Sequence, residues 1–182
     1  MRKFLYAAAL CGAVLLALPC AAAIKALTLD ELTAITHETL LVRITGSATF
    51  APGVPDAEAV WTRLSVEGES LRSGQPFSGS VTFLGSHDPA DHFGTSEMPT
   101  LQDTRLGNRV LLFAERLADF SGGPALVAHN LSYVYRVEDG FGTPVVLGKG
   151  EGAAFPVNVK LSEARALAHA AHVKLQSDAA GK

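Results

Sequence analysis

Imidazole and carboxylate groups are concentrated in one short stretch of the chain. Two of each fall within six consecutive residues, and they are His87, Asp88, Asp91 and His92. Such groups are ligands for zinc and other divalent cations. Because Pro89 lies between the two histidines and favours a turn, the histidines are expected to approach each other. The stretch therefore predicts a divalent-metal site formed by these four side chains.

The same stretch has a second interpretation as an ordinary solvated loop. Aspartate is common in turns, where its side chain bonds to nearby backbone groups. The spacing of the histidines matches no metal-binding motif of known geometry. Glu97 and Asp103 follow in the chain and are available to complete a metal shell. The residues alone leave both interpretations open.

Other candidate residues do not complete a catalytic motif. His37 and Glu38 begin the zinc-protease pattern H-E-x-x-H, but Leu41 occupies the place of the second histidine. No serine lies in a G-x-S-x-G elbow, and no glycine-rich segment completes a nucleotide-binding pattern. His169 and His172 are spaced to share a helix face, and we expect both to be exposed. The lack of a complete catalytic motif in the sequence therefore favours a protein without enzymatic activity.

The first 23 residues contain the three parts of a secretory signal peptide. Arg2 and Lys3 provide a basic start, an apolar run of 14 residues ends at Leu18, and alanines occupy positions 21–23. That run is shorter than the ~20 residues of a membrane-spanning helix. We therefore expect residues 1–23 to be cleaved, the protein to be secreted or periplasmic, and no membrane span to remain.

Cleavage after Ala23 changes the composition that bears on function. It removes both cysteines, Cys11 and Cys20, so the mature chain is expected to form no disulfide, thiolate metal site or cysteine nucleophile. The remaining 13 basic and 18 acidic residues give a net charge of −5, which argues against binding to nucleic acid. An uncleaved anchor, or a lipid attached at Cys20, fits the segment less well.

Two helices are predicted, one near each end of the mature chain. Thr28 and Glu31 fit a capping box, which predicts a short helix from about Leu29 to His37. A second helix is predicted from about Ser162 to Gln176, with Ser162 as its N-cap. Its apolar stripe is expected at Leu167, Ala171 and Leu175.

The sequence between these helices predicts strands. Apolar and polar residues alternate from Val60 to Glu67, the run Arg109–Ala114 is strongly apolar, and Leu131–Val137 with Pro144–Leu147 resembles a hairpin. A long polar segment, Gly85–Gly107, shows no apolar period. We therefore predict a mainly β fold, a small antiparallel barrel or sandwich over residues 24–160, followed by a C-terminal helix and tail over 161–182.

Three aromatic residues are candidates for a binding face. Tyr133 and Tyr135 are two apart and so share one side of a strand, and Trp61 lies on another strand. The alternative is that these rings pack in the core or in the hairpin. Few basic residues lie between them, unlike the pattern of a nucleic-acid platform.

The pattern of elements resembles a group of uncharacterised exported bacterial proteins. The resemblance covers about Leu27 to Pro156 and rests on the leucine helix Leu27–Leu32, the strand Leu40–Ile44, the pair Trp61-Thr62 and the strand Gly107–Phe113. More distantly, the layout resembles the OB-like barrel of netrin-like modules and metalloproteinase inhibitors. Those inhibitors use an N-terminal cysteine, whereas the mature chain here is expected to begin at Ile24. The resemblance therefore implies an OB-like fold and no functional residues.

Taken together, these features predict an exported, non-enzymatic binding or structural module with a protein or envelope partner. The alternative is a metal-binding or metal-dependent protein that uses the His87–His92 loop. A weaker alternative is a protease-inhibitor-like module without cysteines.

Overall fold

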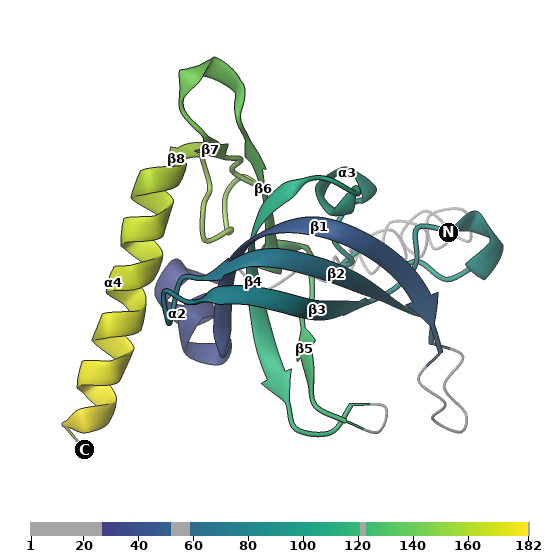
Figure 1. The fold of residues 1–182 in the computed structure, drawn as a ribbon, viewed down its shortest axis with the longest axis horizontal. Coiled ribbons are helices and arrows are strands. Elements are labelled where there is room, and N and C mark those ends of the chain that lie inside the picture. Colours follow the sequence, from purple (N-terminus) through teal and green to yellow (C-terminus); the bar gives the residue numbers. More distant parts are fainter. Residues whose placement is uncertain (1–26, 52–58, 121–122, 182) are drawn as a thin grey trace, which may run out of the picture.

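The computed structural model describes residues 27–51, 59–120 and 123–181, and the expected signal peptide lies outside them. The helices are α2 (Leu29–Ile35), α3 (Leu101–Thr104) and α4 (Leu161–Ala180). The strands are β1 (Glu38–Phe50), β2 (Trp61–Ser70), β3 (Pro76–Leu84), β4 (Arg109–Leu117), β5 (Ala125–Val127), β6 (Val134–Glu138), β7 (Val145–Val146) and β8 (Val159–Lys160). The predicted mainly β fold, with a short helix near the N-terminus and a helix at the C-terminus, is confirmed (Figure 1).

Five of the strands form a closed ring. The order β1-β2-β3-β5-β4 returns to its start because β1 also pairs with β4. Four of the five pairings are antiparallel, but β3 and β5 run parallel, so the sheet is mixed rather than purely antiparallel. The ring is not a regular barrel. Strands β6, β7 and β8 extend the sheet from β4 toward the start of α4.

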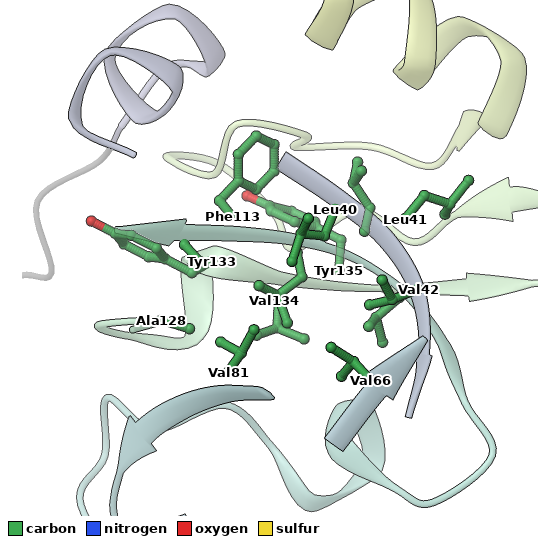
Figure 2. Packing of buried hydrophobic residues seen from close by; sticks show 14 of the residues in the cluster. Leu40, Leu41, Val42, Val66, Val81, Phe113, Ala128, Tyr133, Val134 and Tyr135 are labelled. Atoms are coloured by element: carbon green, nitrogen blue, oxygen red, sulfur yellow. The ribbon is translucent and has the colours of Figure 1, made fainter. Parts of the chain in front are cut away.

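The core fills the inside of the ring. Every residue of β4 from Val110 to Ala114 is buried, because neighbouring elements cover both faces of that strand. Tyr135 lies among the core residues, close to Phe113 (Figure 2). Its ring centre is 6.1 Å from that of Phe113 and 5.2 Å from that of Phe155. Tyr133 is buried as well. The two tyrosines therefore belong to the core, and the hypothesis that they form a binding face is wrong.

Helix α2 begins where its capping box predicts. The Glu31 backbone N–H donates to the Thr28 hydroxyl, and the Thr28 N–H donates to the Glu31 carboxylate at 2.9 Å. The helix ends at Ile35 instead of His37, because Thr36 is extended and the His37 N–H donates to the Ala114 carbonyl of β4. The chain thus leaves the helix directly into β1.

Helix α4 buries a different face from the predicted one. It begins at Leu161, one residue before Ser162, and packs against α2 along one side of the molecule (Figure 1). Its buried side chains are Leu161, Ala164, Ala168, Ala171 and His172. Leu167 is exposed, so the predicted stripe was wrong by part of a turn, and so was the expected exposure of His172. In an alanine-rich helix the apolar pattern is weak, and the surface that it packs against decides the orientation.

Two further segments differ from the sequence prediction. The expected hairpin is shorter, because Leu131–Tyr133 forms a 3-10 turn before β6 pairs with β7. Strand β5 was not predicted. The long segment Gly85–Gly107 is not a single open loop, since it contains a 3-10 turn, Pro89–Asp91, and helix α3.

Candidate functional site

The two aspartates of the predicted metal loop stabilise the loop itself. The Asp88 carboxylate accepts the Ala90 N–H at 2.9 Å and so caps the 3-10 turn Pro89–Asp91. The Asp91 carboxylate accepts a short hydrogen bond from the Ser86 hydroxyl. Both carboxylates are therefore occupied by local hydrogen bonds of the kind that turns use.

The two histidines of the same loop lie in different surroundings. The His87 ring faces the core, 6.0 Å from the Phe83 ring, and burial lowers the pKa of His87 against a smaller opposite effect of a hydrogen bond with the Pro99 backbone. His92 is exposed, with a left-handed backbone conformation at φ 48°. Within the described residues, no group of three or more metal-binding side chains comes together. The metal site remains a prediction that this geometry does not support.

His87 and Asp88 do line a cavity of about 430 Å³ between β1 and α3. Arg105, Leu101 and Leu106 of the α3 region form its other wall. The Nε2 atom of His87 is buried and has no hydrogen-bond partner in the described part of the chain. Because that atom is buried, His87 does not offer its Nε2 to the cavity.

Of the two further candidates for a metal shell, Glu97 is exposed and Asp103 is committed to an ion pair. The Lys149 ammonium lies 2.8 Å from its carboxylate and also donates to the Leu131 carbonyl at 2.7 Å. The Lys149 side chain is 12% exposed and that of Asp103 is 14% exposed. This pair joins α3 to the segment after β7, and the sequence offered no signal for it.

A cavity of about 450 Å³ is lined by residues of β2, β3 and the end of β4, and by the described residues that lead into β5. We call it the β2–β3 cleft. Its polar lining residues are Arg63 of β2, Ser80 and Thr82 of β3, and Arg116 of β4. The remaining lining residues are Phe77, Phe120, Gly123, Pro124, Ala125 and Leu126.

An aromatic cluster stands at one end of the cleft. The Phe120 ring, from the segment after β4, packs edge-to-face on Trp61 at 4.6 Å and on Phe50 at 6.3 Å between centroids. The Arg63 guanidinium lies 4.4 Å above the centre of the Phe50 ring. The alternation of β2 already placed Trp61 and Arg63 on the same outer face. No local signal identified Phe120.

The charges on the cleft wall are all positive. Arg63 and Arg116 are the charged residues that line it, and no aspartate, glutamate, histidine, lysine or cysteine does among the described residues. Arg116 is paired with Glu38 at 3.2 Å. Among the described residues, Arg63 contacts Phe50 and has no carboxylate partner. Within that part of the chain, the cleft therefore presents a cation without a paired anion beside aromatic and apolar surface.

A smaller cavity of about 260 Å³ lies where α4 meets α2. His172, His37 and Arg72 line it, and the His172 ring is hydrogen-bonded to the Thr39 hydroxyl at 2.9 Å. Burial, followed by the nearby charge of Arg72, lowers the pKa of His172. Its buried position favours a structural role.

No protein-family model, no curated protein sequence and no solved structure matches this chain. None of the helices in the described ranges is long and apolar enough to cross a membrane. The functional conclusion therefore rests on the residues and their geometry.

Proposed function

We propose that this protein is an exported, non-enzymatic binding module, and that the β2–β3 cleft is its ligand site. The observation that carries the proposal is a cavity of about 450 Å³ that combines Arg63 and Arg116 with the Phe120 ring and apolar side chains. Binding sites for small ligands have volumes of about 300–1,000 Å³ and combine apolar walls with a few polar groups. The cleft has both properties.

The lining of the cleft supports binding rather than catalysis. General acid–base catalysis uses a side chain such as histidine, glutamate, aspartate, lysine or cysteine, and none of these is among the described lining residues. The Ser80 hydroxyl would need an adjacent base to act as a nucleophile. The Thr82 hydroxyl already donates to the Leu126 carbonyl at 3.2 Å.

The position of the cleft in the fold supports the same proposal. OB-like barrels are five-stranded and partly open, and they bind ligands on the face of the second and third strands and on the loops after the first and fourth. Here Arg63 and Ser80 come from β2 and β3, Phe50 ends β1, and Phe120 follows β4. This likeness is an analogy of fold, so the ligand itself must be inferred from the side chains.

Ser80 and Ser78 provide a matched pair of variants for a direct test. Both are exposed on β3, but only Ser80 lines the cleft. Immobilised wild-type protein and the variants Ser80→Tyr and Ser78→Tyr are exposed to fractionated envelope extract from producing cells. We expect the same bound component with the wild type and Ser78→Tyr, and its loss with Ser80→Tyr. Equal retention by all three proteins, or no retention by the wild type, would contradict the proposal.

Export has its own test. The basic start, the apolar run and the alanines of residues 1–23 support cleavage after Ala23. N-terminal sequencing of protein from the periplasm or the medium is expected to begin at Ile24. Protein that stays inside the cell with Met1 intact would show that export is wrong and would leave the cleft assignment unaffected.

A further inference from the structure

We infer that the β2–β3 cleft takes a ligand with an anionic oxygen group, bound by Arg63, next to an apolar or aromatic group. This inference rests on the proposed function, because it names the chemical class of ligand for that site. Three features of the cleft lead to it: its charge, the orientation of Arg63, and its apolar walls.

The charge of the cleft is opposite to that of the whole chain. The chain has a net charge of −3, yet the charged side chains on the described wall of the cleft are Arg63 and Arg116. Arg116 is partly neutralised by Glu38, whereas Arg63 has no carboxylate partner among the described residues. A cationic ligand would meet repulsion here without a compensating group, and an anionic ligand would supply the missing charge.

The contact with Phe50 holds the Arg63 guanidinium in place. The Cζ atom of Arg63 lies over the Phe50 ring, 4.4 Å from its centre. Stacking of this kind uses the face of the planar group and leaves the N–H donors on its edge for other partners. Those donors match the two oxygens of a carboxylate or phosphate. Arg63 therefore has the features of a prepositioned anion-binding side chain.

The rest of the cleft fits the apolar part of such a ligand. Phe77, Pro124 and Leu126 line the cavity, and Phe120 links it to the Trp61 ring. The exposed hydroxyl of Ser80 provides a further polar contact on the β3 side. A free anion without an apolar group would leave these surfaces unused.

Four small probes of similar shape test the inference on the full chain: benzoate, phenyl phosphate, benzamide and benzylamine. Trp61 is the single tryptophan of the chain, so intrinsic fluorescence reports on the aromatic cluster, and the thermal midpoint gives a second readout. We expect benzoate or phenyl phosphate to bind about tenfold more tightly than benzamide, or better, since hydrogen bonds to charged groups are stronger than those between neutral groups. Benzylamine should be the weakest. The two anions distinguish a carboxylate site from a phosphate site.

Variants identify the residue responsible for the preference. Arg63→Gln should remove the preference for anions, and Arg63→Lys should retain part of it, because lysine keeps the charge without the planar donor edge. Arg105→Gln is the control, since Arg105 is also exposed but lines a different cavity. An unchanged preference in Arg63→Gln would overturn the inference.

The failures of the two proposals are distinguishable. Binding of all four probes with equal affinity, and its loss in Ser80→Tyr, would retain the cleft as the site and reject an anionic ligand. An anionic ligand is also rejected, and the cleft is again kept as the site, if no probe binds but Ser80→Tyr abolishes capture of an envelope component. If no probe binds and capture does not depend on Ser80, both proposals are wrong.

Discussion

The imidazole of His172 and the hydroxyl of Thr39 are hydrogen-bonded at 2.9 Å, although 133 residues separate them in the chain. Both side chains are buried. The bond attaches the C-terminal helix α4 to the first strand of the ring, beside α2. It makes the packing of α4 depend on an imidazole, whose charge changes with pH.

Acidification is therefore expected to destabilise the protein partly through His172. Burial, with the nearby Arg72 and His169, lowers the pKa of His172 in the folded state, while Glu38 acts in the opposite direction. Because the folded pKa is below the unfolded one, the unfolded chain binds the proton more readily. The stabilisation is complete above about pH 6.5 and is lost as the pH falls through the folded pKa. Thermal midpoints between about pH 7.5 and about pH 5 measure this loss.

Two glutamine variants separate His172 from the other titrating groups. His172→Gln keeps a polar side chain near Thr39 but cannot titrate, so its midpoint should fall less on acidification than that of the wild type. His169→Gln should stay close to the wild type, because His169 is exposed and has the smallest of the four effects on the pKa of His172. Part of the acid sensitivity should persist in both, since burial also lowers the pKa of His87. Identical pH profiles for His172→Gln and the wild type would rule out this role.

The ion pair between Lys149 and Asp103 is expected to stabilise the fold. Lys149→Met leaves a mostly buried carboxylate without its partner, which costs about 3 kcal/mol. Denaturant unfolding measures this change, and the double variant Lys149→Met/Asp103→Leu should recover much of it. Lys174→Met is the control, because the Lys174–Asp30 pair is exposed and such pairs contribute little. A similarly small loss of unfolding free energy in both lysine variants would show that the Lys149–Asp103 pair does not stabilise the fold.

Gly68 is expected to tolerate no side chain. A Cβ atom at this position would lie 2.2 Å from the Leu41 carbonyl oxygen and 2.7 Å from the Val42 Cα of β1. Because both are backbone atoms, Gly68→Ala must separate β1 from β2, and we expect a loss of about 3 kcal/mol or more in unfolding free energy. Gly140→Ala should be nearly neutral, since its Cβ would meet no atom within 4 Å. Equal stability of the two variants would contradict this close packing.

His92 offers a test of the metal-binding alternative. Its backbone is left-handed, at φ 48°, a conformation that costs a non-glycine residue about 1–2 kcal/mol. Glycine adopts this conformation without strain, but it loses more backbone entropy on folding, which costs about 0.5–1 kcal/mol. His92→Gly is therefore expected to raise the unfolding free energy by about 0.5 kcal/mol. A metal ligand would behave differently, since its loss would lower stability and a chelator would destabilise only the wild type. Midpoints of both proteins with and without chelator decide between these outcomes.

Local features of the sequence were sufficient to predict some of the elements, but not β5, α3 or the buried face of α4. The cap formed by Thr28 and Glu31 predicted the start of α2, and the alternation along β2 predicted its buried face. Both signals lie within a few residues of the structure that they predict, so they do not depend on the rest of the fold. The absence of a complete catalytic motif was likewise a property of the sequence itself.

Tertiary structure alone decided the closure of the ring and the location of the cleft. β1 pairs with β4, and β3 runs parallel to a short β5 that has no strong local signal. Arg63, Arg116 and Phe120 come together because β3 pairs with both β2 and β5, and β5 pairs with the end of β4. The conspicuous His87–His92 loop did not become the best candidate site, since its carboxylates are bonded within the turn. Residue types were visible in the sequence, but which of them share a cavity depends on long-range strand pairing, for which the sequence has no local pattern.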